Sequence, residues 1–126
     1  MTQERQRGPD VYGQGTPTRE ALERLANRWT VLITYALEER PTRFNELRKR
    51  LEISAQVLSR VLRELERDGL IARQAYAEVP VRVEYTLTEL GGTMCAIVHD
   101  IRMWAEQTAP AITQARAVYD ESSARV

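Results

Sequence analysis

The sequence predicts an α+β fold that is mainly α, and three observations support this prediction. Two short amphipathic segments, residues 43–51 and 54–68, follow each other with a connection of two residues. Gly69 ends the second segment, and alternating apolar and polar residues within 71–87 then indicate a two-stranded hairpin. Longer helical patterns flank this unit on both sides. Together these elements predict a winged helix-turn-helix with flanking N- and C-terminal dimerisation helices.

The length of 126 residues predicts one domain. We assign it to residues 18–121, between an N-terminal arm over 1–17 and a frayed C-terminus over 122–126. The arm is expected to be mobile because glycine and proline are frequent there among polar residues. No apolar run approaches the about 18 residues of a membrane span, and the first residues form no secretory signal. The sequence therefore predicts a cytoplasmic protein without a membrane segment.

The first predicted helix starts at Thr18, whose hydroxyl can cap it. Leu22, Leu25 and Trp29 then recur on one face at helical spacing. An apolar run follows from Trp29 and contains several β-branched residues, which are typical of a strand. We nevertheless interpret it as helix, because charged residues and Pro41 follow it in the manner of a helix end.

Thr42 is predicted to cap the next helix, which runs from Arg43 to about Leu51. Ser54 caps the helix after it, and Gly69 ends that helix in the left-handed conformation open to glycine. The apolar side chains of the second helix fall on one face: Val57, Leu58, Val61, Leu62 and Leu65. This face is expected to lie in the core, with the opposite face in solvent.

The hairpin is predicted to have strands over 71–77 and 82–87, with a tip between them where Pro80 is tolerated. Thr88 then caps a long helix with an apolar stripe of about four turns. Pro110 is expected to interrupt this helix or to restart it.

The chain has no net charge, but its charges are distributed unevenly. Between Arg40 and Arg73 there are nine basic and five acidic residues, a local charge of +4. A bounded basic surface on a neutral protein suits a limited DNA footprint. The preference for arginine over lysine in this stretch fits contacts to phosphate or guanine, although genomic base composition explains it equally well.

The exposed face of the predicted helix over 54–68 is the main candidate for a functional site. In a helix-turn-helix, the N-terminal half of the second helix meets base edges in the major groove. Glutamine can pair with adenine, arginine with guanine, and alanine can contact the methyl group of thymine. We therefore expect base contacts from four residues of this half: Ala55, Gln56, Ser59 and Arg60.

Contacts with the DNA backbone are expected from basic residues of both helices and of the hairpin. Arg43 lies near the start of its helix, where backbone N–H groups also attract phosphate. Arg73 and Arg82 add positive charge on the hairpin. The expected backbone contacts are Arg43, Arg48, Lys49, Arg63, Arg67 and Arg82.

Two alternatives to these contacts stay open at this point. The polar face of the helix over 54–68 can be a solvated surface with pairs one turn apart, such as Arg60 with Glu64. Arg82 can pair with Glu84 or Glu78 rather than with DNA.

Little in the sequence indicates catalysis. Cys95 and His99 are the single cysteine and the single histidine, so neither a disulfide nor a histidine metal cluster is expected. The two share a helix face, but no third group is placed to orient the imidazole, and we interpret Cys95 as a structural thiol. We therefore predict a protein that is not an enzyme and that has no cofactor or metal.

Several segments of the chain resemble the HxlR family of bacterial transcription regulators, which are relatives of the MarR group. They are WTVLI at residues 29–33, RFNEL at 43–47, RVLRELERDGL at 60–70 and EVPVRVEYTLTELG at 78–91. The resemblance extends over residues 16–108. It implies a winged-helix dimer that pairs through its N- and C-terminal helices, with each subunit contacting one half-site of a palindrome.

The chain departs from this family at one position. Many members have a Cys-Pro pair before the first helix, whereas this chain has Thr16 and Pro17 there. Threonine forms no thiolate, which puts the family's redox switch in doubt, and Cys95 does not occupy that position. A small-molecule effector is one substitute for it. The candidate residues for its pocket, which we interpret more readily as core and dimer interface, are Trp29, Tyr35, Met94, Val98 and Trp104.

The sequence thus predicts a homodimer that binds double-stranded DNA at a palindromic operator, with a recognition helix over about 54–68 and a wing over about 71–87. The apolar stripes outside the winged unit support a dimer, because that unit is too small to cover them. The alternative is a protein-interaction module that uses a winged helix without DNA. The basic recognition helix argues against this alternative, since such a module would present acidic or apolar residues there.

Overall fold

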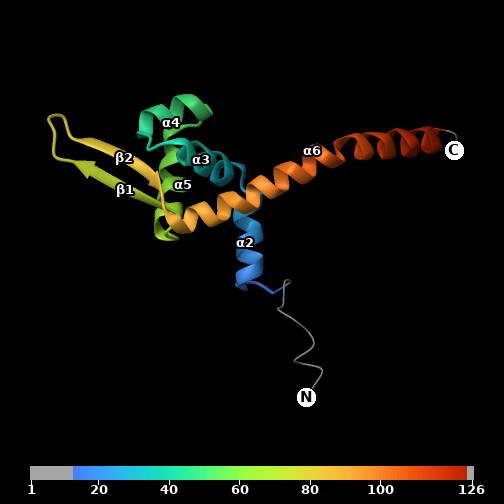
Figure 1. Cartoon of the computed structure of the whole chain (residues 1–126), viewed down its shortest axis with the longest axis horizontal. Coiled ribbons are helices and arrows are strands. Elements are labelled where there is room, and N and C mark those ends of the chain that lie inside the picture. The colour runs from blue at the N-terminus through green and yellow to red at the C-terminus, as the bar shows by residue number, and fades with distance from the viewer. Residues whose placement is uncertain (1–12, 125–126) are drawn as a thin grey trace, which may run out of the picture. The chain divides into compact units, whose positions relative to one another are not determined.

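The computed structural model describes residues 13–124 of the chain (Figure 1). Most of the predicted N-terminal arm, residues 1–12, lies outside this range, as do residues 125–126. The described chain forms two compact units, residues 13–95 and residues 96–124. The elements are α2 (Pro17–Ala26), α3 (Arg28–Glu39), α4 (Phe44–Leu51), α5 (Ala55–Arg67), β1 (Ile71–Tyr76), β2 (Arg82–Leu87) and α6 (Glu89–Ala124).

The core of the first unit is formed by α3, α4, α5 and the base of the hairpin. Apolar side chains from each of these elements are buried there, among them Ile33, Leu47, Leu58, Val61, Leu65 and Ile71. Burial of one such side chain contributes about 1.5–3 kcal/mol to folding. The predicted inward face of α5 is therefore confirmed, and the winged helix-turn-helix has the predicted order of elements.

The N-terminal segment contains a break that the sequence analysis did not predict. The chain leaves helical conformation at Asn27, whose Oδ1 accepts hydrogen bonds from the N–H groups of Trp29 (3.0 Å) and Thr30 (3.3 Å). Asn27 thus caps α3 and separates it from α2. The prediction that Thr18 starts the first helix was also wrong. Thr16 is the cap, and Pro17 takes the first helical position, where a missing N–H costs nothing.

The prediction that Thr42 caps α4 was wrong as well. Arg43 is the N-cap residue, and its side chain makes no capping hydrogen bond. Thr42 is instead buried, and its hydroxyl donates to the carbonyl of Arg40 at 2.9 Å. Its backbone exchanges two hydrogen bonds with Tyr85, at 3.0 and 2.8 Å. Thr42 therefore joins the start of α4 to the hairpin, a long-range contact that local sequence patterns do not show.

Both ends of α5 agree with the prediction. Ser54 caps its start, and its Oγ accepts from the N–H of Val57 at 3.2 Å. At its end, Gly69 has φ of +76°. The N–H of Gly69 donates to the carbonyl of Glu66, and that of Leu70 to the carbonyl of Leu65, both at 3.0 Å. This pair of hydrogen bonds is a Schellman motif, which fixes the direction in which the chain enters β1.

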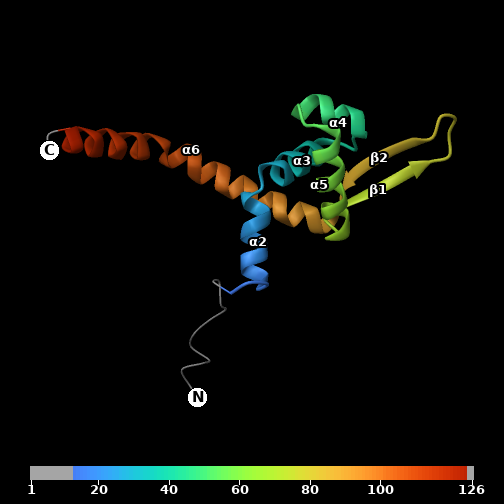
Figure 2. The same cartoon turned by 180° about the vertical axis from the view of Figure 1, so that it is seen from behind.

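The hairpin is antiparallel, with Ile71 opposite Leu87 at its base and Tyr76 opposite Arg82 near its tip. β1 ends one residue before the predicted end at 77. Ile71 is buried and Leu87 packs against the core, so the base of the hairpin is fixed to the helices. Figures 1 and 2 show from opposite sides that the tip points away from α4 and α5.

The start of α6 is held tightly against the end of α5. The predicted cap Thr88 is confirmed, since its Oγ1 accepts from the N–H of Gly91 at 3.0 Å. The same hydroxyl donates to the carbonyl of Gly69 at 2.6 Å. A Cβ atom at Gly91 would lie 2.1 Å from the carbonyl oxygen of Leu70, so this close approach requires glycine.

The last helix is longer than predicted. α6 runs without interruption from Glu89 to Ala124, and Pro110 lies inside it. The expected break at Pro110 was therefore wrong. A proline inside a helix costs about 3 kcal/mol, but the neighbouring alanines have the highest helix propensity and favour continuation. No helix within residues 13–124 is both long and apolar enough to cross a membrane.

Candidate nucleic-acid interface

The face of α5 opposite the core presents the predicted base-contacting residues together. Gln56 and Arg60 are exposed, and Ala55 and Ser59 are half-buried beside them. With Arg63, these four residues line one open surface on the first turns of the helix. The arrangement follows from the helical repeat, because the buried side chains hold the opposite side of α5 in the core.

Arg60 also makes the ion pair that the sequence left open. Its Nη1 lies 3.7 Å from Oε1 of Glu64, one turn further along α5, and both side chains are more than half exposed. An exposed pair of this kind contributes about 0.3–0.5 kcal/mol. A bidentate contact of arginine with guanine contributes about 1–3 kcal/mol to base discrimination. The pair with Glu64 is therefore weak enough to be exchanged for a base.

Arg43 stands at the start of α4 in a setting suited to a phosphate. It is exposed, and it makes no ion pair within residues 13–124. No side chain caps the amides of the first turn of α4. A cationic side chain beside free N–H groups at a helix N-terminus is a favourable environment for an anion.

Several other basic residues are also unpaired in the described part of the chain. Arg48 and Lys49 are exposed in the last turn of α4, while Arg50 beside them is neutralised by Glu39 at 2.6 Å. Arg63 is exposed on α5. Unpaired cations remain available to neutralise phosphates, whereas a paired one must first give up its partner.

Arg73 gains a role that its position in the sequence did not reveal. It is exposed on β1 and lies directly opposite Tyr85 in the hairpin register. Together with Ser59, Arg63 and the acidic Glu66, it lines a groove of about 310 Å³ between α5 and the hairpin. The groove therefore brings a basic residue of the hairpin next to the recognition helix. Only the packing of the hairpin on α5 reveals this neighbourhood.

Arg82 is in a different situation, because the hairpin itself neutralises it. Its guanidinium lies 3.1 Å from the Glu78 carboxylate and 3.2 Å from that of Glu84. It also stacks on the ring of Tyr76, 4.0 Å from the centroid. The structure thus has the ion pairs that were the alternative for Arg82, which leaves its contact with DNA with less support than that of Arg43.

Arg67 also lies apart from the other predicted contacts. It lines a cleft with Glu20 and Glu23 of α2 and with Glu64 and Asp68. Arg67 makes no ion pair in the described part of the chain, but the acidic side chains around it lower the local positive potential that a phosphate would meet. The sequence could not show this, because α2 is more than 40 residues away in the chain.

The candidate pocket residues do not share one environment. Met94 belongs to the core of the first unit, and Trp29 packs against that core. Tyr35 is half-buried in the same unit. Val98 and Trp104 lie in the second unit, where the Trp104 side chain is 61% exposed. For Met94 and Trp29, the interpretation as core residues is the one that fits the structure.

Cys95 is a buried thiol with little tendency to ionise. It is 2% exposed, and burial raises its pKa more than a hydrogen bond with Thr34 lowers it. A raised pKa keeps the sulfur protonated and therefore weakly nucleophilic near neutral pH. Within residues 13–124, no group of three or more histidine, cysteine and acidic residues could hold a metal ion.

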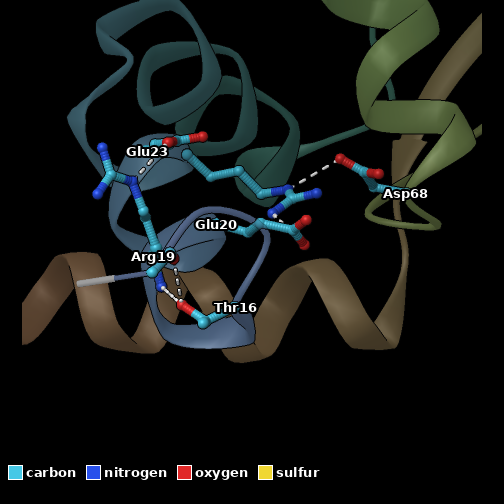
Figure 3. A network of polar contacts seen from close by, with 7 residues as sticks. Thr16, Arg19, Glu20, Glu23 and Asp68 are labelled. Carbon is cyan, nitrogen blue, oxygen red and sulfur yellow. Dashed lines mark hydrogen bonds and ion pairs between the residues drawn. The ribbon is translucent and has the colours of Figure 1, made fainter. Parts of the chain in front are cut away.

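Thr16 has a structural contact of its own. Figure 3 shows it at the start of α2, where its Oγ1 accepts from the N–H of Arg19 at 3.3 Å. The hydroxyl also donates to the carbonyl of Gly13 at 3.1 Å. The side chain at position 16 therefore caps a helix in this chain.

Comparison with known proteins places this geometry among regulators. The family model described as HxlR-like helix-turn-helix matches residues 24–113. YtfH of Escherichia coli K12, an HTH-type transcriptional regulator, is 38% identical over 116 residues, which are 91% of this chain and 90% of YtfH.

Two solved structures have the same fold over most of their length. The structure of ytfH from Salmonella typhimurium has a TM-score of 0.70 and 35% identity, and the match covers 86% of this chain and 97% of that one. A structure assigned to the MarR family of transcriptional regulators, from Enterococcus faecalis V583, has a TM-score of 0.70 and 30% identity. Its match covers 82% of this chain and 98% of that one. These proteins are transcriptional regulators and not enzymes.

Proposed function

Because the chain belongs to the HxlR family and is a DNA-binding transcriptional regulator, we propose that it acts as a homodimer on a palindromic operator. Each copy inserts α5 into a major groove and lays its hairpin beside the adjacent backbone. The protein meets its operator in the cytoplasm.

The observation that supports this proposal most directly is the composition of the exposed face of α5. Gln56 and Arg60 project from its first turns and can form two hydrogen bonds each, with adenine and with guanine respectively. Ser59 can bond to either base, and Ala55 can contact the methyl group of thymine. Acidic residues are absent from this surface of the described chain, and its two apolar residues, Ala55 and Val57, are small.

Backbone contacts fix the register of α5 on the duplex. Arg43 and the free amides at the start of α4 bind one phosphate, and Arg48 and Lys49 extend this contact. Arg63 and Arg73 bind another phosphate at the groove between α5 and the hairpin. Arg67 and Arg82 contribute less, because acidic neighbours already attract them.

The second unit supports the dimer. Within residues 96–124, apolar side chains recur at helical spacing on one side of α6 and remain about half exposed or more: Ile97, Ile101, Trp104, Val118 and Tyr119. A continuous apolar stripe of this length is typical of a surface that a partner covers. In a symmetric dimer the same stripe serves both copies, and it sets the two half-sites about 34 Å apart or at a multiple of that distance.

Regulation of this dimer does not use a cysteine at the start of the first helix, because Thr16 is present there and caps α2. Cys95 is buried, and burial raises its pKa and so disfavours a reactive thiolate there. We propose a small-molecule effector that binds without a covalent bond.

The experiment that tests the function is a selection of duplexes by the full chain from a random pool, followed by titration of the recovered sequence at rising salt. A palindrome should be enriched, and its affinity should fall about 10³-fold or more between 50 and 200 mM salt if about six to ten phosphates are contacted. A scrambled duplex of equal composition is the control. A pool without enriched sequence, or an affinity that does not respond to salt, would instead support a protein-interaction module.

A further inference from the structure

An ion pair connects the N-terminal helix to the recognition helix. Nε of Arg24, on α2, donates to Oδ2 of Asp68, at the end of α5, over 2.9 Å. Arg24 is also 4.0 Å from Glu20, one turn earlier in α2. Figure 3 shows Asp68 facing α2 across the space between the two elements. By contrast, Arg19 pairs with Glu23 inside α2.

Asp68 occupies a position at which a carboxylate is unfavourable by itself. It is the C-cap residue of α5, and its backbone N–H donates to the carbonyl of Glu64. The C-terminus of a helix has a partial negative charge, so an aspartate there needs a cation close by. Arg24 supplies that cation, and the hydrogen bond to Asp68 raises the pKa of its guanidinium.

The surroundings make Arg24 hard to replace. The cleft of about 420 Å³ between α2 and α5 is lined by four carboxylates and two arginines: Glu20, Glu23, Glu64, Asp68, Arg24 and Arg67. Glu23 and Glu64 also pair with Arg19 and Arg60. Without Arg24, the carboxylates of Glu20 and Asp68 would have only Arg67 beside them in the cleft. Repulsion between the acidic side chains of α2 and those of α5 would then push the helices apart.

The pair also connects the C-terminal end of α5 to α2. The first turns of α5 carry the base-contacting residues, and the Schellman motif at Gly69 fixes the other end of the helix. Arg24 attaches that fixed end to α2. Leu22 on α2 is 56% exposed in the single chain, and we include this helix in the proposed dimer surface. Neither Arg24 nor Asp68 lines the open surface on the first turns of α5.

We propose that the Arg24–Asp68 pair is a positioning contact that sets the orientation of α5 relative to α2, and thereby the half-site spacing that the dimer accepts. The proposal rests on the function proposed above, because spacing has meaning only for a dimer on a palindrome. The pair thus contributes to the choice of half-site spacing without contacting DNA.

The test measures affinity for duplexes that carry the selected half-sites at their selected spacing, or one base pair closer or further apart. The full-length wild type should bind the duplex of the selected spacing more tightly than the other two. Arg24→Ala and Asp68→Ala should each lose about three- to tenfold in affinity at the selected spacing and discriminate less, while a single half-site is bound as before. Because the two residues act as a pair, the double variant should be no worse than either single one.

Arg19→Ala is the matched control, since it removes an arginine of the same helix that pairs with Glu23 and is not the one that binds Asp68. It should keep the spacing preference, and Arg24→Lys should restore most of it. Hydrogen exchange of residues 17–26 in the free protein should be faster in Arg24→Ala than in Arg19→Ala.

The proposal is overturned if Arg24→Ala and Asp68→Ala discriminate among spacings as the wild type does, or if Arg19→Ala loses as much. That result leaves the proposed function intact. A wild type that selects no duplex at all contradicts both the function and this inference.

Discussion

At the scale of single residues, the distinction between base contacts and phosphate contacts follows from position on the helices. Arg60 projects from the first turns of α5, whereas Arg43 stands at the uncapped start of α4. The same side-chain type is therefore expected to serve two purposes. The sequence could assign these purposes because helical spacing alone decides which face a residue occupies. It offered the pairing of Arg82 with Glu78 or Glu84 only as an alternative, and it could not predict that Arg73 faces α5, since that depends on how the hairpin packs.

Substitution of Arg60 and of Arg43 should distinguish a base contact from a phosphate contact. Arg60→Ala should lower affinity for the selected operator by about 1–3 kcal/mol and relax the choice of one base pair, with little effect on non-specific binding. Arg43→Ala should weaken specific and non-specific binding alike and reduce the dependence on salt by about one unit of slope. Titrations of both variants on operator and scrambled duplexes measure the difference. Equal loss on the two duplexes for Arg60→Ala would place Arg60 on the backbone.

The buried thiol gives a second prediction at this scale. Burial raises the pKa of Cys95, so the folded protein keeps the thiol protonated at a pH where the unfolded chain begins to ionise. Alkylation by iodoacetamide at about pH 8 should therefore be much slower in the folded than in the denatured protein. The thiol should also make folding less favourable as pH rises above its ordinary pKa of about 8.5, because only the unfolded chain then gains by ionisation. Equal alkylation rates would show that Cys95 is accessible.

At the scale of elements, the helix caps show what local patterns can and cannot predict. Ser54 and Gly69 were predicted because each stands at the boundary of a clear apolar period. Asn27 was missed because apolar residues continue on both sides of it, which hides the break between α2 and α3. Thr42 was misassigned because its role depends on Tyr85, far away in the sequence. The elements were thus predictable where the signal was local.

Two adjacent glycines test the junction between α5 and α6. A Cβ atom at Gly91 would lie 2.1 Å from the carbonyl oxygen of Leu70, whereas nothing lies within 4 Å of one at Gly92. Gly91→Ala should therefore lower the free energy of unfolding by about 2 kcal/mol or more. Gly92→Ala should leave it unchanged or raise it by up to about 1 kcal/mol, because alanine favours helix. Denaturant unfolding compares the two, and equal stabilities would mean that the junction is looser than described.

At the scale of the whole molecule, the proposed function requires two copies of the chain. The apolar stripe of the second unit is exposed in a single chain, and a palindromic operator calls for a twofold partner. The sequence predicted this requirement from the length of the stripe, although it placed a break at Pro110 that does not exist. It could not predict which residues of the stripe meet the partner, because that depends on the packing of two chains.

A charge within the stripe should therefore separate the copies. Trp104→Glu places a carboxylate on a surface that the dimer would bury, and should yield a monomer in sedimentation experiments. Thr113→Glu adds the same charge on the other side of α6 and should remain dimeric. The monomer should keep its weak affinity for a single half-site and lose its preference for the palindrome. A Trp104→Glu protein that stays dimeric would show that the stripe is not the interface.

Site-specific photo-crosslinking can show whether the first turns of α5 lie against bases in the major groove. A photoreactive amino acid at position 56 should crosslink to a base inside each half-site, while one at Glu23, on α2, should not crosslink to DNA. Crosslinks from position 23 but none from position 56, in a complex that binds the operator, would contradict the account.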